Sequence, residues 1–169
     1  KFMDVLKSIN SNDAVDIALF GRMTTSDAFQ DIEAAMQVAH AISTHEAIPG
    51  IDYFTTVDDF GKAGGGAGHV GEAIMDSPCF YKYFSLDWEQ LVHNLAGPQP
   101  DEKNQPEDYK TWKDKITPQA GRLAACTLGH FIKAAACEVP TGKKNSTAPN
   151  NRPEGILIEL RDTAPISYA

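Results

Sequence analysis

Two adjacent carboxylates, Asp58 and Asp59, are the residues best suited to general-base or metal-ion chemistry. Neighbouring residues of an extended chain point to opposite faces, so the pair does not form a two-carboxylate site by itself. Turn formation and the solubility of a hairpin explain these aspartates more simply. The histidines add no metal site, because His40 and His45 would face opposite sides of a strand and no spacing fits zinc. We therefore expect no catalytic residue and no bound metal.

A second group, residues 142–146 (GKKNS), combines a glycine with two lysines and two small polar side chains. Backbone N–H groups in such a turn, together with Lys143, Lys144 and Asn145, can hold an anion such as a phosphate. The upstream glycine of a Walker A loop is missing, and an exposed polar loop is the simpler interpretation of these residues alone. The glycine run AGGGAG does not connect a strand to a helix in a βαβ unit, so no dinucleotide and no other cofactor is expected.

Residues 51–73, IDYFTTVDDFGKAGGGAGHVGEA, join strand-forming residues to a glycine-rich stretch. The simplest structure with both properties is a long hairpin, with a return strand near residues 72–75. Tyr53 and Phe54 point to opposite sides of the first strand, so at least one of them is exposed unless something covers it. Such a side chain can pack in a core, or it can stack on nucleic-acid bases, at roughly 1–3 kcal/mol per base.

Composition limits the class of protein. The 169 residues suffice for one ordinary globular core, and no apolar run approaches the roughly 18 residues that span a bilayer. The net charge is −8, which argues against indiscriminate nucleic-acid binding. Many of the acids lie in a proline-rich stretch that we interpret as a solvated insertion, residues 97–116, and the rest is nearer neutral. Cys79, Cys126 and Cys137 form no C-x-x-C pair, which favours thiols in a reducing cytoplasm.

Short apolar or alternating runs predict strands outside the hairpin. In residues 32–45, larger side chains alternate with smaller ones from Met36 onward, although residues 32–35 are compatible with a helical turn. VDIALFGRM, CFYKYFS and GILIELRD are the other strand-like runs. The predicted strands are therefore residues 15–23, 36–45, 79–85 and 155–162.

Two helices are expected between these strands. Asp87 can cap a helix over WEQLVHNL. Thr117 and Pro118 resemble an N-cap and a first helical residue, and the helix they begin should run to about Cys137, before Pro140. The element order is that of an α+β fold in which helices cover one sheet face. The side chains expected to face inward are Trp88, Leu91, Val92 and Leu95 in the first helix, and Leu123, Leu128, Phe131, Ile132 and Ala135 in the second.

Five blocks in order, VDIALFGRM, AAMQVAHAISTH, IDYFTTVDD, CFYKYFSLD and EVPTGKKNS, resemble CasC, the repeated backbone subunit of the type I-E CRISPR surveillance complex Cascade. The resemblance covers nearly the whole chain except the insertion. It implies an RNA-recognition-motif-like (ferredoxin-like) antiparallel sheet with helices on one face and a protruding hairpin thumb, residues 48–76. The family has a strand and a basic segment before the residue matched by Lys1, so residues 1–169 would be a single truncated domain.

The resemblance also implies a non-catalytic function. Copies of the family stack along the CRISPR RNA, and each thumb crosses the guide and kinks one nucleotide outward, while base pairing reads the sequence. The implied partners are CRISPR RNA, target DNA through the guide, further copies and other Cascade subunits, with no membrane. By block correspondence, the residues that would contact bases are Met23, Phe54, Thr55 and Val57. Tyr53 would share this contact or anchor the hairpin. In the GKKNS group, which also contains Asn145, Lys143 and Lys144 would meet the RNA backbone.

Two other functions stay open. Related backbone subunits of type III complexes cleave RNA with a loop aspartate, so a metal-dependent ribonuclease using Asp58 or Asp59 is one alternative. A purely protein-binding assembly module, whose aromatic side chains serve subunit contacts, is the other. A sheet that lacks its first strand has an open edge, which favours pairing with a second copy.

Overall fold

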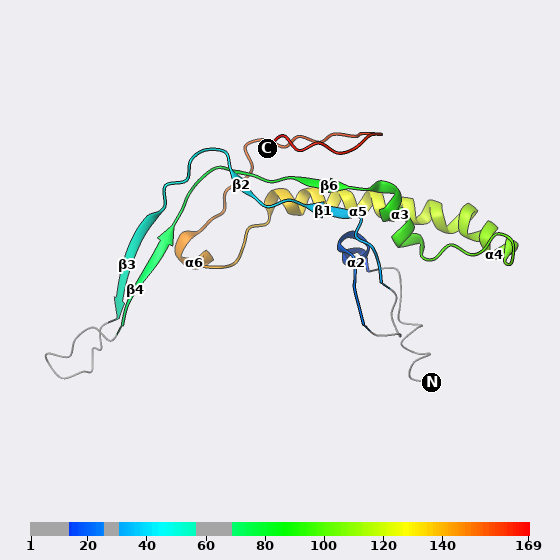
Figure 1. Ribbon diagram of the computed structural model, residues 1–169, viewed down its shortest axis with the longest axis horizontal. Helices are drawn as coiled ribbons and strands as arrows, with labels where there is room; N and C mark the ends of the chain where they lie inside the picture. The colour runs from blue at the N-terminus through cyan, green and yellow to red at the C-terminus, as the bar shows by residue number, and fades with distance from the viewer. Residues whose placement is uncertain (1–13, 26–30, 57–68) are drawn as a thin grey trace. The chain divides into compact units, whose positions relative to one another are not determined.

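A computed structural model describes residues 14–25, 31–56 and 69–169 (Figure 1). The chain divides into two compact units, and each has its own elements. Unit 1 comprises Lys1–Val38 and Phe84–Ile166, and unit 2 comprises Ala39–Tyr83 and Ser167–Ala169. No helix in the described ranges is long and apolar enough to cross a membrane.

Unit 1 combines one short antiparallel ladder with all the helical elements of the described residues. Strand β1 (Met36–Val38) lies antiparallel to β6 (Phe84–Leu86). Helix α3 (Trp88–Ala96) begins just after β6, and Oδ1 of Asp87 accepts the backbone N–H of Gln90 at 3.0 Å. This confirms the predicted cap and helix, but Trp88 is 43% exposed, so its predicted inward position is wrong. The other helical elements are α2 (Val15–Phe20), α4 (Pro106–Thr111), the π-helical turn η1 (Trp112–Ile116), α5 (Thr117–Cys137) and α6 (Lys144–Thr147).

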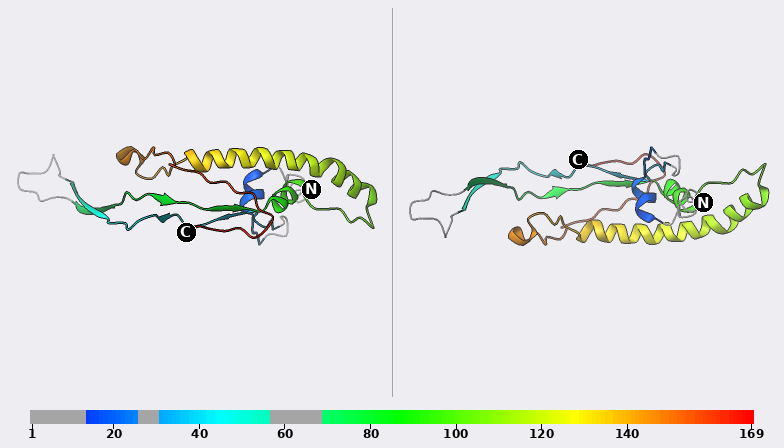
Figure 2. Two further views of the ribbon diagram at one scale, coloured as in Figure 1. Left: turned by 90° about the horizontal axis from the view of Figure 1, so that it is seen from above. Right: turned by 90° about the horizontal axis from the view of Figure 1, so that it is seen from below.

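The core of unit 1 lies where α3 packs against α5, the long helix of Figure 2. Leu91 of α3 and Ala124 of α5 are completely buried. The small side chains of Ala120 and Ala124 allow the two helices to lie close together. Phe131 continues this face of α5 and meets Phe84 edge-on, with ring centroids 5.2 Å apart. The buried apolar residues are Ala18, Leu19, Ala35, Met36, Leu91, Leu95, Ala96, Ala120 and Ala124.

Unit 2 is built on two antiparallel ladders. Strand β3 (Gly50–Thr56) pairs with β4 (His69–Met75) along its whole length, which confirms the two strands predicted for the hairpin. Strand β2 (Ile42–Ser43) pairs with β5 (Phe80–Tyr81). None of the described residues of unit 2 is fully buried. A two-stranded ribbon without a covering layer is marginal in water, so this unit gains stability from any surface that covers it.

The predicted α+β class is confirmed by the mixture of helices and antiparallel strands. In the described residues the strands form three two-stranded ladders. A single RNA-recognition-motif-like sheet covered by helices on one face stays a prediction.

The strand predicted over residues 15–23 is wrong, because Val15–Phe20 forms helix α2. A short apolar run suits a buried strand and a buried helical turn equally well, since both bury apolar side chains. In α2, Ala18 and Leu19 are buried, and the helix ends at Gly21, whose φ of 78° favours glycine. The helical turn considered for residues 32–35 is absent.

The strands predicted over residues 36–45 and 79–85 are confirmed in part. Each is interrupted, because residues 39–41 and 82–83 lie outside the strands. Between the β1–β6 ladder and the β2–β5 ladder, residues 39–41 therefore stand opposite only residues 82–83, and this extra residue resembles a β-bulge. His40 lies in this interruption, so the predicted placement of two histidines on opposite sides of one strand is wrong.

Residues 97–116, predicted as a solvated insertion, become helical from Pro106 onward. Elements α4, η1 and α5 follow one another without a break, because the residues at their junctions have helical φ and ψ. Thr117 is therefore not an N-cap, and its hydroxyl donates to the carbonyl of Trp112 at 3.0 Å. Trp112 packs against the core of unit 1, and its indole N–H donates to the carbonyl of Gly97 at 3.4 Å. One aromatic side chain thus anchors a stretch that is otherwise mostly exposed.

A turn precedes α4. The backbone N–H of Lys103 donates to Oδ1 of Asp101 at 2.9 Å, and the side-chain amide of Asn104 donates to Oδ2. Both hydrogen bonds favour the carboxylate and lower the pKa of Asp101 below its ordinary value. The same residue's carbonyl accepts the N–H of Gln105 at 2.7 Å, which closes the turn.

Helix α5 ends at Cys137 as predicted, but its inward face is shifted. Leu123 is 38% exposed, so its predicted inward position is wrong. The buried residues of α5 are Ala120, Ala124 and Thr127. Leu128, Phe131, Ile132 and Ala135 are partly buried, as expected for the edge of the contact. The contact with α3 selects small side chains, which hydrophobicity alone does not reveal.

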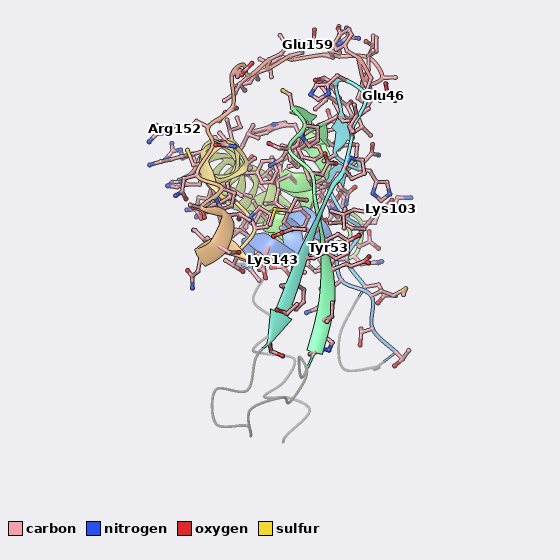
Figure 3. All side chains as sticks on the ribbon, turned by 90° about the vertical axis from the view of Figure 1, so that its left-hand side faces the viewer. Glu46, Tyr53, Lys103, Lys143, Arg152 and Glu159 are labelled. Atoms are coloured by element: carbon pink, nitrogen blue, oxygen red, sulfur yellow. The ribbon has the colours of Figure 1, made fainter. Side chains whose placement is uncertain are left out.

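No strand forms over residues 155–162, where one was predicted. A strand requires a neighbour for its backbone N–H and C=O groups, and no described residue pairs with this segment. Its apolar side chains are exposed, with Leu160 at 95%. Figure 3 labels Glu159 on this extended segment.

Candidate nucleic-acid interface

The β3–β4 ribbon has two chemically different faces, because successive side chains of a strand point to opposite sides. Directly opposed residues of the two strands share a face. One side, which we call the Tyr53 face, consists of Ile51, Tyr53, Thr55, Val70, Glu72 and Ile74. The other, the Phe54 face, consists of Gly50, Asp52, Phe54, Thr56, His69, Gly71, Ala73 and Met75.

Both faces expose large apolar side chains. Tyr53 is 64% exposed and Phe54 is 48% exposed, and Ile51, Val70 and Ile74 are also exposed. Isolated exposed apolar residues are common on proteins, but a contiguous group on one narrow ribbon is typical of a binding surface. Figure 3 labels Tyr53 on this ribbon. Tyr53 and Thr55 thus lie together, whereas Phe54 lies on the reverse side.

Phe54 has a defined environment on its own face. It lies directly opposite Gly71 in the ladder, and its ring covers that glycine. The ring centroid lies 6.1 Å from that of His69, with the two planes tilted by 51°. One side of the phenyl ring is therefore against the ribbon, and the remaining exposed surface is available to a ligand.

Met23 belongs to unit 1 and is 92% exposed. It follows Arg22, which forms an isolated antiparallel bridge with Ile32. A shallow hollow beside it is lined by residues 20–23 and 31–34. An exposed methionine next to a hollow is a flexible apolar contact of the kind found on adaptable binding surfaces.

Asn94 supports this segment, and sequence reasoning missed it. The residue is buried on α3, and its Nδ2 donates to the carbonyl of Ala18 at 2.9 Å and to that of Glu33 at 2.8 Å. The amide thereby ties α3 to α2 and to Glu33, the residue after the Arg22–Ile32 bridge. An amide on the same helical face as Leu91 and Leu95 is the signal that could have identified it.

Residues 142–146, where an anion site is predicted, form a turn whose hydrogen bonds converge on one carbonyl. The carbonyl of Lys143 accepts the backbone N–H groups and the hydroxyls of Ser146 and Thr147, all at 3.0 Å. The backbone N–H of Ser146 is therefore occupied within the turn, and an anion site at residues 142–146 stays a prediction. Lys143, Lys144 and Asn145 are exposed, and Figure 3 labels Lys143 beside α6. Two adjacent ammonium groups can still contact a phosphate through their side chains.

The predicted contact residues thus form separate groups. Tyr53, Phe54 and Thr55 lie on β3 of unit 2. Met23 and residues 142–146, which we call the lysine loop, lie in separate parts of the unit 1 sequence. Val57, Asp58 and Asp59 lie outside the described residues.

Within the described ranges, no group of three or more His, Cys, Asp or Glu side chains could hold a metal ion. The ring of His45 serves the backbone: Nε2 accepts the N–H of Cys79 at 3.3 Å, and Nδ1 donates to the carbonyl of Glu46 at 2.9 Å. Cys79, Cys126 and Cys137 are free and exposed.

One protein family matches the whole chain. Residues 1–169 match the family described as CT1975-like protein. The chain belongs to this family. No curated protein matches it.

Two solved structures resemble this member of the CT1975-like family. One, a "CRISPR RNA-guided surveillance complex, pre-nicking", has a TM-score of 0.61 and 28% identity over 83% of this chain and 32% of its own. The other, a "CRISPR RNA-guided surveillance complex", has a TM-score of 0.59 and 26% identity over 89% of this chain and 49% of its own. The chain thus spans a third to a half of these neighbours. The resemblance found in the five sequence blocks is confirmed.

Proposed function

We propose that the chain is the RNA-binding part of a Cascade backbone subunit of type I-E, with no enzymatic activity. Copies would polymerise along the CRISPR RNA in the cytoplasm and support pairing between guide and target DNA in antiviral defence. The observation that carries the proposal is the likeness to chains of two CRISPR RNA-guided surveillance complexes over 83% and 89% of the sequence. Other Cascade subunits would complete the assembly.

The β3–β4 ribbon supports this proposal as the thumb. It displays exposed aromatic and aliphatic side chains, and its unit has no fully buried residue among those described. Such a ribbon is stabilised when a partner covers it, which is what a nucleic acid and a neighbouring subunit would do. Base stacking on an aromatic ring does not depend on sequence, as a subunit repeated along a guide requires.

Charge supports a local rather than a general RNA contact. The chain carries a net charge of −8, so attraction to phosphates has to come from particular places. The exposed lysines at positions 143 and 144 are one such place. We propose that they meet the RNA backbone while the ribbon contacts bases.

The substitution Phe54→Ala tests the proposal. Loss of one stacking side chain should weaken binding of a labelled single-stranded RNA carrying a CRISPR repeat by roughly 5- to 150-fold. Fluorescence anisotropy measures the affinity, and circular dichroism checks that the fold is retained.

Phe80→Ala is the matched control, because Phe80 is 56% exposed and lies on β5 of the same unit but not on the ribbon. We expect it to bind RNA like the parent chain. Failure of the parent to bind, or equal affinities of parent and Phe54→Ala, would contradict the proposed function.

A further inference from the structure

Phe54 and Gly71 form a directly opposed pair in the β3–β4 ladder. A Cβ atom added to Gly71 would collide with Cζ of the Phe54 ring and lie 2.9 Å from both Cε1 and Cε2. Equal distances to the two Cε atoms mean that this Cβ would meet the face of the ring symmetrically, near its outer end. The ring therefore lies flat over the glycine, in space that any other residue would fill.

The imidazole ring of His69 lies beside the Phe54 ring and restricts its sideways movement. Its centroid lies 6.1 Å from the ring centroid of Phe54, at an angle of 51°. That arrangement is a normal tilted aromatic contact. Phe54 is nevertheless 48% exposed, so about half of its surface stays accessible. Because one ring face rests on Gly71, the opposite face is the one on which a base would stack.

We propose that Gly71 and His69 are positioning residues, which hold the Phe54 ring flat as a stacking platform for one unpaired nucleobase of a single-stranded RNA. This inference rests on the proposed function and adds to it the face of the thumb that carries the base contact. The Phe54 face receives the base, and the Tyr53 face, which lacks such a platform, serves other contacts.

Preorganisation is the physical reason for this arrangement. A free phenylalanine side chain loses rotamer freedom when a base stacks on it, and that loss subtracts from affinity. A ring already resting on Gly71 loses less on binding. Aromatic side chains that cover a cross-strand glycine also stabilise ribbons, so a purely structural role is the alternative that a test must separate.

Gly71→Ala displaces the ring with little other change. The obstructing atoms belong to the outer end of a flexible side chain, and Gly71 has no positive φ that alanine would strain. Gly50→Ala is the matched control, because Gly50 lies on the same face and its added Cβ would meet only the carbonyl of Met75, at 3.9 Å. Binding of a fluorescein-labelled single-stranded RNA carrying a CRISPR repeat should weaken at least about fivefold in Gly71→Ala and stay unchanged in Gly50→Ala.

A double-mutant cycle separates positioning from general loss of structure. In the Phe54→Ala background, Gly71→Ala and His69→Ala should have no further effect on RNA affinity, because the ring they hold is gone. An additive effect of Gly71→Ala would assign it to the fold of the ribbon, and an additive effect of His69→Ala would assign it to direct RNA contact. Either result would overturn the positioning role of that residue.

The outcome also separates this inference from the function on which it rests. If the parent chain binds the RNA and Phe54→Ala weakens it, but Gly71→Ala binds like the parent, the inference is overturned and the proposed function stands. If the parent does not bind at all, both are overturned.

Discussion

The buried amide of Asn94 shows how a single residue positions a surface segment. Both hydrogens of its Nδ2 are used, on the carbonyls of Ala18 and Glu33, and its Oδ1 accepts from the side-chain amide of Gln90 at 2.9 Å. Rotation of the amide by half a turn would place its oxygen against two carbonyl oxygens, so only one orientation is possible. The residue therefore ties helix α3 both to α2 and to Glu33, one of the residues that line the hollow beside Met23.

Asn94→Ala should lower the free energy of unfolding by about 1–3 kcal/mol, because it leaves carbonyls without donors in a buried place. Urea unfolding followed by circular dichroism measures this change. Gln90→Ala is the control, since it removes only the hydrogen bond to Oδ1, from a partly exposed residue. Equal losses in the two variants would show that the carbonyl contacts contribute nothing.

Two glycines are required for different physical reasons. Gly21 has a φ of 78°, and a Cβ there would also lie 2.7 Å from the carbonyl oxygen of Ile32. Gly71 has an ordinary extended backbone and is needed only for the space that Phe54 occupies. At the first position the backbone itself disfavours a side chain, and at the second a side chain would displace the Phe54 ring.

The contact between α3 and α5 is the element-scale feature that stabilises unit 1. Leu91 lies at its centre with no exposed surface, against the small residues of α5. Asn94 and Leu95 are on the same face of α3, so the packing also fixes the amide described above.

Leu91→Ala should therefore destabilise unit 1 by about 2–5 kcal/mol, because a cavity replaces a fully buried side chain. Thermal unfolding monitored by circular dichroism reports the loss. Leu123→Ala makes the same chemical change on an exposed position of α5 and should cost about 0.5 kcal/mol or less. A similar effect at both positions would contradict the assignment of the helix faces.

At the scale of the whole molecule, the acidic charge and the proposed ligand oppose each other. A net charge of −8 repels RNA at long range, so binding has to rely on local cations and on stacking. The two contributions differ in their response to salt. Phosphate contacts release counterions and weaken with salt, whereas stacking does not depend on the phosphates.

Lys143→Ala/Lys144→Ala should make the plot of log affinity against log salt shallower by up to about 1.4, because two phosphate contacts to a single strand are lost. A salt series of RNA-binding titrations measures this slope. Lys113→Ala/Lys115→Ala removes the same charge from exposed positions of η1 and is expected to leave the slope nearer that of the parent. Equal slopes in the two variants would attribute the effect to net charge and would remove the lysine loop from the RNA interface.

The sequence by itself determined the features that depend on local chemistry. The alternation and glycine pattern predicted the β3–β4 hairpin, Asp87 predicted the start of α3, and the five ordered blocks identified the family. These signals are local because a cap, a turn and a strand of alternating residues each depend on a few neighbours in the chain.

Only the tertiary structure decided where the remaining residues belong. The run at Val15–Phe20 became a helix because its buried side fits the core of unit 1, and residues 155–162 stayed unpaired because no described strand lies beside them. The burial of Asn94 and the fit of Gly71 beneath Phe54 each depend on residues distant in sequence. Hydrophobicity indicates that a side chain is buried, but the partner that covers it is set by packing in space.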